Sequence, residues 1–149
     1  MATVEITEQN FKEITHQGVV LLDWWAEWCG PCRRFAPIYE EASARYPDVV
    51  FGKIDTEAQS NLAASFGIRS IPTIMVIRDG VMLFSQPGAL PGELLDELIT
   101  KVREVDMDEV RQRIAEAEAQ GEGEEEDGEE DEDGPVAGAN GKTATGKKD

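Results

Sequence analysis

The sequence is poor in metal-binding and membrane-spanning features. It contains two cysteines and one histidine in 149 residues, whereas a structural zinc site usually takes about four ligands of these types. No apolar run reaches the length of a membrane-spanning helix, and the N-terminus lacks the charged-then-apolar pattern of a secretion signal. We therefore expect a cytoplasmic protein that binds no metal and does not associate with membranes.

Basic residues are also scarce. The chain carries 14 Lys and Arg against 31 Asp and Glu, which gives a formal net charge of −17. A protein that binds nucleic acid needs a basic stripe or patch to neutralise phosphates, and the sequence has no such stripe. The composition therefore argues against a nucleic-acid partner.

The charge is uneven along the chain, and this divides the chain into three parts. Ten of the twelve residues in 122–133 are acidic, and the residues after them offer no large apolar side chain. Such a segment cannot bury enough apolar surface to offset the entropy that it would lose on ordering. We expect one domain over 1–105, a helical extension over 106–120 and an acidic disordered tail over 121–149.

The apolar pattern of residues 1–105 predicts an α/β fold. A nearly continuous apolar run at 19–26 is typical of a central strand covered on both faces, and Asp79-Gly80 between two apolar runs predicts a hairpin. The other strands are expected at 4–6, 49–54, 73–77 and 81–84, and the helices at 11–17, 31–46, 58–66 and 92–102. The predicted order is β-α-β-α-β-α-β-β-α, with helices that connect parallel strands before the hairpin and the final helix.

The two cysteines lie where the central strand gives way to a helix, in the segment Trp28-Cys29-Gly30-Pro31-Cys32. Residues three apart at a helix start have Cα atoms roughly 5 to 6 Å apart, which a disulfide can bridge. Free backbone N–H groups and the helix dipole favour a thiolate at the N-terminus, so we expect Cys29 to be the nucleophile. Cys32, one turn further in, is the expected resolving thiol.

The residues allow two other interpretations of the cysteine pair. A metal site lacks ligands, because His16 lies far away in the first predicted helix. A purely structural disulfide that closes so short a loop would constrain the unfolded chain little. Redox chemistry is therefore the favoured interpretation.

The run Asp-Trp-Trp-Ala-Glu-Trp-Cys-Gly-Pro-Cys at 23–32 resembles the active-site signature of the thioredoxin family. The predicted order of elements resembles the thioredoxin fold, a central mixed β-sheet flanked by helices. The resemblance extends from about residue 3 to about residue 105. It implies several residue roles that spacing alone does not give.

The resemblance implies a proton acceptor for the resolving thiol. Asp23 is similar to the buried aspartate of the family that takes this proton, and Lys53 is similar to the lysine that tunes it. The residues themselves leave other interpretations open: Asp23 as a strand-end residue that reaches solvent, and Lys53 as an ordinary surface lysine.

The resemblance also implies a substrate groove around the cysteines. The expected substrate-binding residues are Trp28, Gly30, Pro31, Ile71, Pro72, Gly88 and Ala89. The Ile71-Pro72 bond is expected to be cis, with an ordinary trans proline as the alternative. Pro87 stands where the family usually has an aliphatic residue. Arg33 and Arg34 either raise the local positive potential or lie on a solvated helix face.

The function that the resemblance implies is that of a protein disulfide reductase, which serves electron transport and cell redox homeostasis. Its expected partners are disulfide-containing proteins and a thioredoxin reductase that uses flavin and NADPH. We expect a monomer with no cofactor bound to the chain itself. One alternative is a redox-dependent interaction or chaperone-like module that uses the groove and the acidic tail. An oxidant or isomerase is disfavoured by Gly30-Pro31 and by the missing signal segment.

Overall fold

The structure is a computed structural model that describes the backbone of residues 2–128 and the side chains of residues 2–121. The chain divides into two compact units after Glu104. The elements in chain order are β1 (Thr3–Glu5), α1 (Phe11–Thr15), β2 (Val19–Trp25), α2 (Gly30–Arg45), β3 (Val50–Asp55), α3 (Ser60–Ser65), β4 (Thr73–Arg78), β5 (Val81–Pro87), α4 (Gly92–Glu104) and α5 (Met107–Gly128). The first nine elements follow the order predicted from the sequence.

The first unit is built on a mixed five-stranded sheet with the order β1-β3-β2-β4-β5. The strands β1, β3 and β2 pair in parallel, whereas β4 and β5 pair antiparallel. Strand β2 is central, as its continuous apolar run predicted, and five of its seven residues are fully buried. The sheet and its flanking helices confirm the predicted thioredoxin-type α/β class.

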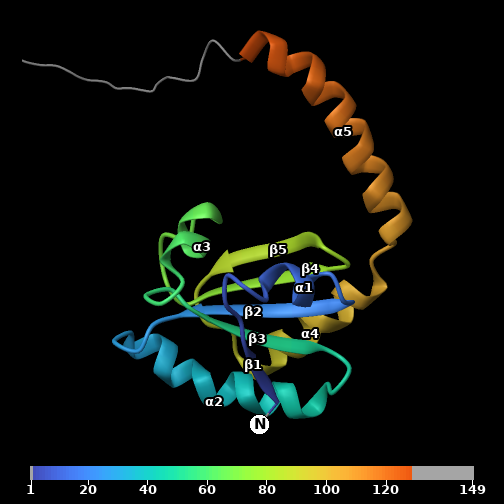
Figure 1. The fold of residues 1–149 in the computed structure, drawn as a ribbon. Helices are drawn as coiled ribbons and strands as arrows, with labels where there is room; N and C mark the ends of the chain where they lie inside the picture. The colour runs from blue at the N-terminus through green and yellow to red at the C-terminus, as the bar shows by residue number, and fades with distance from the viewer. Residues whose placement is uncertain (1, 129–149) are drawn as a thin grey trace, which may run out of the picture. The chain divides into compact units, whose positions relative to one another are not determined.

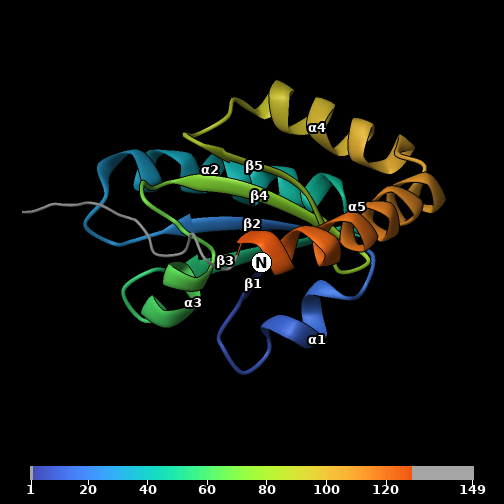
Figure 2. The same cartoon turned by 90° about the horizontal axis from the view of Figure 1, so that it is seen from above.

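Helices cover both faces of this sheet (Figures 1 and 2). Helices α2 and α4 lie on one face and α1 and α3 on the other. Alternate residues of β2 therefore enter different cores: Leu21 packs with residues of α2 and α4, whereas Leu22 and Trp24 pack on the opposite face. Burial of these two apolar faces is the main force that holds the central strand in place.

The turn between β4 and β5 is the hairpin predicted from Asp79-Gly80. Both residues have positive φ, 54° at Asp79 and 82° at Gly80. A two-residue turn with positive φ at both positions matches the twist of the flanking strands. The hairpin therefore fixes the edge strand β5 against β4.

The second unit contains helix α5. Asp106 caps it, because its Oδ1 accepts hydrogen bonds from the backbone N–H groups of Asp108 and Glu109 at 3.1 and 3.2 Å. Two ion pairs, Arg111 with Asp108 and Arg113 with Glu109, follow within the next turns. The division into an extension at 106–120 and a disordered tail at 121–149 stays a prediction, and its part at 129–149 lies outside the described residues.

Of the helices in the described part of the chain, none is both long enough and apolar enough to cross a bilayer.

Candidate active site

The site begins where β2 ends and α2 starts. The backbone N–H of Cys29 donates to the carbonyl oxygen of Ala26 at 3.2 Å, which closes a tight turn after the strand. Cys29 has an extended backbone conformation and caps α2, and Pro31 occupies the first turn of the helix. Proline fits there because the N–H that it lacks would have no partner inside the helix. The local sequence therefore places Cys29 at the helix N-terminus.

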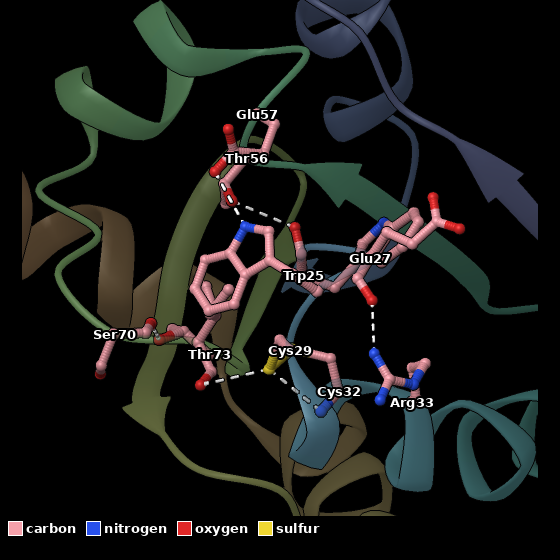
Figure 3. Close-up of a disulfide and its surroundings, with 11 residues drawn as sticks. Trp25, Glu27, Cys29, Cys32, Arg33, Thr56, Glu57, Ser70 and Thr73 are labelled. Atoms are coloured by element: carbon pink, nitrogen blue, oxygen red, sulfur yellow. Dashed lines mark hydrogen bonds between the residues drawn. A yellow bond between two sulfur atoms is a disulfide. The ribbon is translucent and has the colours of Figure 1, made fainter.

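Cys29 and Cys32 are joined by a disulfide, with their Cα atoms 5.2 Å apart (Figure 3). This agrees with the distance expected from their spacing. The Sγ atom of Cys29 also accepts a hydrogen bond from the backbone N–H of Cys32 at 3.1 Å. The relative exposures of Cys29 and Cys32 are only 4% and 3%, and both pack against Ala26, Trp25 and Ile71. The pair is thus shielded from bulk solvent, and it lies just after the end of the central strand.

The loop before β4 forms the second wall of the site. The Ile71-Pro72 peptide bond is cis, and the carbonyl oxygen of Ile71 lies 3.8 Å from Sγ of Cys29. The Thr73 hydroxyl donates to the carbonyl oxygen of Ser70 at 2.7 Å and tightens this loop (Figure 3). The structure therefore brings the predicted residues Ile71 and Pro72 to the cysteine pair.

Gly88 and Ala89 follow β5 and are both exposed. The backbone N–H of Gly88 donates to the carbonyl oxygen of Pro72 at 2.7 Å, so Gly88 is attached to the cis-proline loop. Its φ of +104° is strained for any residue with a side chain. Pro87 lies opposite Thr73 at the end of the outer strand β5, where the N–H that it lacks is not needed for pairing.

Asp23 lies in the middle of β2 and is buried, not exposed at a strand end. Neither of its carboxylate oxygens has a hydrogen-bond partner among the described residues. Burial raises the pKa of Asp23 to about 7, and the nearby charge of Lys53 opposes this shift. Asp23 can therefore take up or release a proton near neutral pH, which an exposed aspartate cannot do.

Lys53 lies opposite Asp23 in the register of β2 and β3. Its Nζ atom lies over the Trp25 ring, 4.7 Å from the centroid. Lys53 and Trp25 line a cleft of about 430 Å³ together with Asp55 and the strand β1. The structure thus places Lys53 close enough to influence Asp23 electrostatically, while its ammonium group faces an aromatic ring.

Trp28 is the most exposed aromatic side chain of the site, at 67%. Its indole N–H donates to Oε2 of Glu57 at 3.1 Å. Glu57 is itself held by Asp55, whose Oδ1 accepts a hydrogen bond from the Glu57 backbone N–H at 2.9 Å. The sequence did not predict this contact, because the two partners are 29 residues apart and no motif connects them.

A cleft of about 170 Å³ lies beside Trp28. Its lining residues are Trp28, Thr56, Ala63, Ile68, Arg69, Ser70 and Ile71. The sequence identified Trp28 and Ile71 as substrate-binding residues but not the others, which come from the end of β3, from α3 and from the loop after α3. A small, mostly apolar cleft next to a nucleophile can accept a side chain of a bound polypeptide.

The two arginines that follow the motif have different contacts. Nη1 of Arg33 donates to the carbonyl oxygen of Glu27 at 2.6 Å, which ties the first turn of α2 to the preceding loop (Figure 3). Nη1 of Arg34 lies 3.4 Å from the point where a Cβ atom on Gly30 would be. Arg33 is therefore part of the active-site turn, and Arg34 lies beside it.

In the part of the chain that the structure describes, no three His, Cys, Asp or Glu side chains are grouped so that they could hold a metal ion. The chemical groups that the site offers are the cysteine pair and the buried carboxyl of Asp23.

Known proteins are similar to this chain in sequence and in fold. The family model described as Thioredoxin matches residues 2–104. A Streptomyces coelicolor protein that carries the name thioredoxin 2 is 55% identical over 116 residues, which cover 77% of this chain and 87% of that protein. The thioredoxin of Bacillus subtilis is 42% identical over 102 residues, which cover 68% of this chain and 98% of that protein. A solved Plasmodium falciparum thioredoxin matches with a TM-score of 0.60 and 38% identity, over 65% of this chain and 96% of that structure.

Proposed function

The chain belongs to the thioredoxin family and is a protein disulfide reductase, and from this premise we propose that Cys29 attacks the client disulfide and Cys32 resolves the mixed disulfide. The observation that carries this assignment is the position of Cys29. It caps α2 at the point where the helix dipole and free N–H groups stabilise a thiolate, and its Sγ faces the carbonyl oxygen of Ile71.

The reaction consists of two thiol-disulfide exchanges. The Cys29 thiolate attacks one sulfur of the client disulfide, the client S–S bond breaks, and the first client thiolate leaves. The Cys32 thiolate then attacks Sγ of Cys29, the bond between Cys29 and the client breaks, and the second client thiolate leaves. The client gains two electrons, the Cys29–Cys32 pair loses two electrons, and protons from solvent neutralise the client thiolates.

Asp23 is the proposed acceptor of the proton that Cys32 loses before the second step. Its support is burial without a hydrogen-bond partner among the described residues, which raises the pKa of Asp23 to about 7. Lys53 tunes this group, because its positive charge lowers the pKa of Asp23. Among the described residues Asp23 makes no hydrogen bond with Cys32, so the proposed transfer requires an intervening water or a small movement of the chain.

The groove around the disulfide is the proposed client-binding surface. Three segments of backbone contribute to this surface. The first is the cysteine motif with Trp28, Gly30 and Pro31. The second is the loop with Ile71 and Pro72, and the third is the β5–α4 turn with Gly88 and Ala89. The contacts of Ile71 with Cys29 and of Gly88 with Pro72 support this assignment. A client strand that lies along this backbone would present its disulfide to Cys29.

The family implies a thioredoxin reductase and disulfide-containing proteins as partners. We propose that the reductase uses flavin and NADPH, that the protein works as a monomer in the cytoplasm, and that no cofactor binds the chain itself. In the described residues no contact favours the alternative of an interaction or chaperone-like module.

The order of the two cysteines can be tested by trapping the mixed disulfide. Cys32→Ser, incubated with an oxidised client protein, should accumulate a covalent complex that reducing agents release. Cys29→Ser should form little or none. Equal trapping by the two variants, or stronger trapping by Cys29→Ser, would overturn the assignment.

A further inference from the structure

Two arginines flank the active-site cysteines from different elements. Arg34 lies on α2, with Nη1 3.4 Å from the point where a Cβ atom on Gly30 would be. Arg69 lies in the loop that leads to the cis proline and lines the cleft next to Trp28 and Ile71. The carbonyl oxygen of Ile71 lies 3.8 Å from Sγ of Cys29, so the two arginines lie near the nucleophile on two different elements of the chain.

Neither guanidinium group stabilises the fold through a hydrogen bond or an ion pair with another described residue. Arg34 and Arg69 are exposed, and the described residues give them no hydrogen bond and no ion pair. Other arginines of the same unit are engaged: Arg45 pairs with Asp96 at 2.8 Å and Arg103 with Asp48 at 2.7 Å. Two unpaired cations next to the reaction site are notable in so acidic a chain.

Among the described residues, the carboxylates near the motif form no ion pair with these two arginines. The Glu57 carboxylate accepts the indole N–H of Trp28, and the side chain of Glu27 points away from Cys29 (Figure 3). The net charge of −17 acts over a longer range, and at physiological ionic strength exposed charges beyond about 8 Å are largely screened. Both guanidinium groups are therefore free to pair with a carboxylate of a bound client.

We propose that Arg34 and Arg69 bind carboxylates that flank the disulfide of a client. This proposal rests on the proposed role of Cys29 as the nucleophile. A guanidinium group pairs well with a carboxylate because its planar donors match the two oxygens. A client strand against Ile71 extends to both sides of its cysteine, so one acidic residue can reach each arginine. The preferred clients are disulfides that lie in acidic segments.

The test compares three peptides that share one disulfide and carry Glu, Gln or Lys on both sides of the reactive cysteine. The second-order rate of reduction by the pre-reduced full chain is divided by the rate with dithiothreitol, which corrects for intrinsic reactivity. Two exposed ion pairs should favour the Glu peptide over the Gln peptide by about fivefold, and less at high salt. The Lys peptide should be the slowest.

The variants then locate the effect. Arg34→Gln combined with Arg69→Gln should bring the ratio of the Glu and Gln peptides to about one. Lys12→Gln combined with Lys101→Gln removes the same charge from exposed positions on α1 and α4 and should keep the preference. Both double variants are checked for native circular dichroism.

Three results would overturn the inference. The first is equal corrected rates for the Glu and Gln peptides with the unchanged chain. The second is an equal loss of preference in the control double variant, which would assign the effect to overall charge. The third, failure of the chain to reduce any of the peptides, would overturn the proposed function of Cys29 together with the inference.

Discussion

Asp23 and Lys53 lie opposite each other on neighbouring parallel strands, yet the Lys53 ammonium group lies over the Trp25 ring and not against the carboxylate. The carboxyl therefore feels the lysine charge without a direct ion pair. The effect of burial is larger than the effect of this attraction, so the pKa of Asp23 is raised and not lowered. Two measurements on this pair follow from that balance.

The first prediction concerns stability and pH. The unfolded chain releases the Asp23 proton near pH 3.8, whereas the folded chain keeps it until a pKa of about 7. The contribution of Asp23 to stability is therefore full below pH 3.8 and is lost as the pH rises toward 7, by on the order of 4 kcal/mol. Asp23→Asn should remove this loss and be the more stable protein at pH 8. Urea unfolding at pH 4 and pH 8 measures it, with Glu41→Gln as an exposed control. An Asp23→Asn protein that is less stable at pH 8 would contradict the prediction.

The second prediction concerns Lys53. Its charge lowers the pKa of Asp23, so Lys53→Met should raise that pKa further above 7. The carboxyl carbon of Asp23 can be followed by NMR titration of the oxidised protein. Lys101→Met, on the exposed face of α4, should leave the titration in place. A downward shift in Lys53→Met would show that the lysine does not act through its charge.

The third prediction concerns Glu57 and Trp28. Glu57→Ala removes the acceptor of the indole N–H, so Trp28 should lose its fixed orientation over the cleft. We expect a rise in KM for protein clients of about fivefold, because the lost hydrogen bond is on the order of 1 kcal/mol. Glu57→Gln keeps an acceptor oxygen and should restore most of the binding, and Glu93→Ala on α4 is the control. Unchanged KM in Glu57→Ala would mean that the contact does not orient the indole.

The fourth prediction concerns the redox potential of the cysteine pair. Equilibration with glutathione or dithiothreitol buffers, followed by trapping of the thiols of Cys29 and Cys32, should give a value near about −270 mV. Such a value suits a reductant of cytosolic disulfides. A value of about −180 mV or higher would assign the protein to oxidants or isomerases instead.

The sequence predicted the parts of the structure that depend on local patterns. The apolar run of β2, the turn at Asp79-Gly80 and the helix start behind Cys29 each reflect a few adjacent residues. Small shifts occurred where side chains cap backbone groups. Helix α3 begins at Ser60 and not at 58, because the Asp55 carboxylate holds the N–H groups of Glu57 and Ala58 in a turn.

The contacts between distant segments could not be predicted in this way. The bond between Trp28 and Glu57 depends on how the loop after β3 meets the cysteine turn. The position of Lys53 over Trp25 depends on the register of β3 against β2. Arg69 becomes part of the site only because the loop after α3 folds back toward Trp28. Each of these relations arises from tertiary packing, for which one sequence carries no local signal.

The hydrogen bond from the Gly88 N–H to the Pro72 carbonyl has a mechanical meaning for the groove. It links the cis-proline loop to the β5–α4 turn, so each of these segments restrains the other. The Trp28 ring is largely exposed, and its indole N–H has one acceptor, Glu57 on a neighbouring loop. When a bulky client binds, we therefore expect the indole to change position more readily than the linked loop and turn.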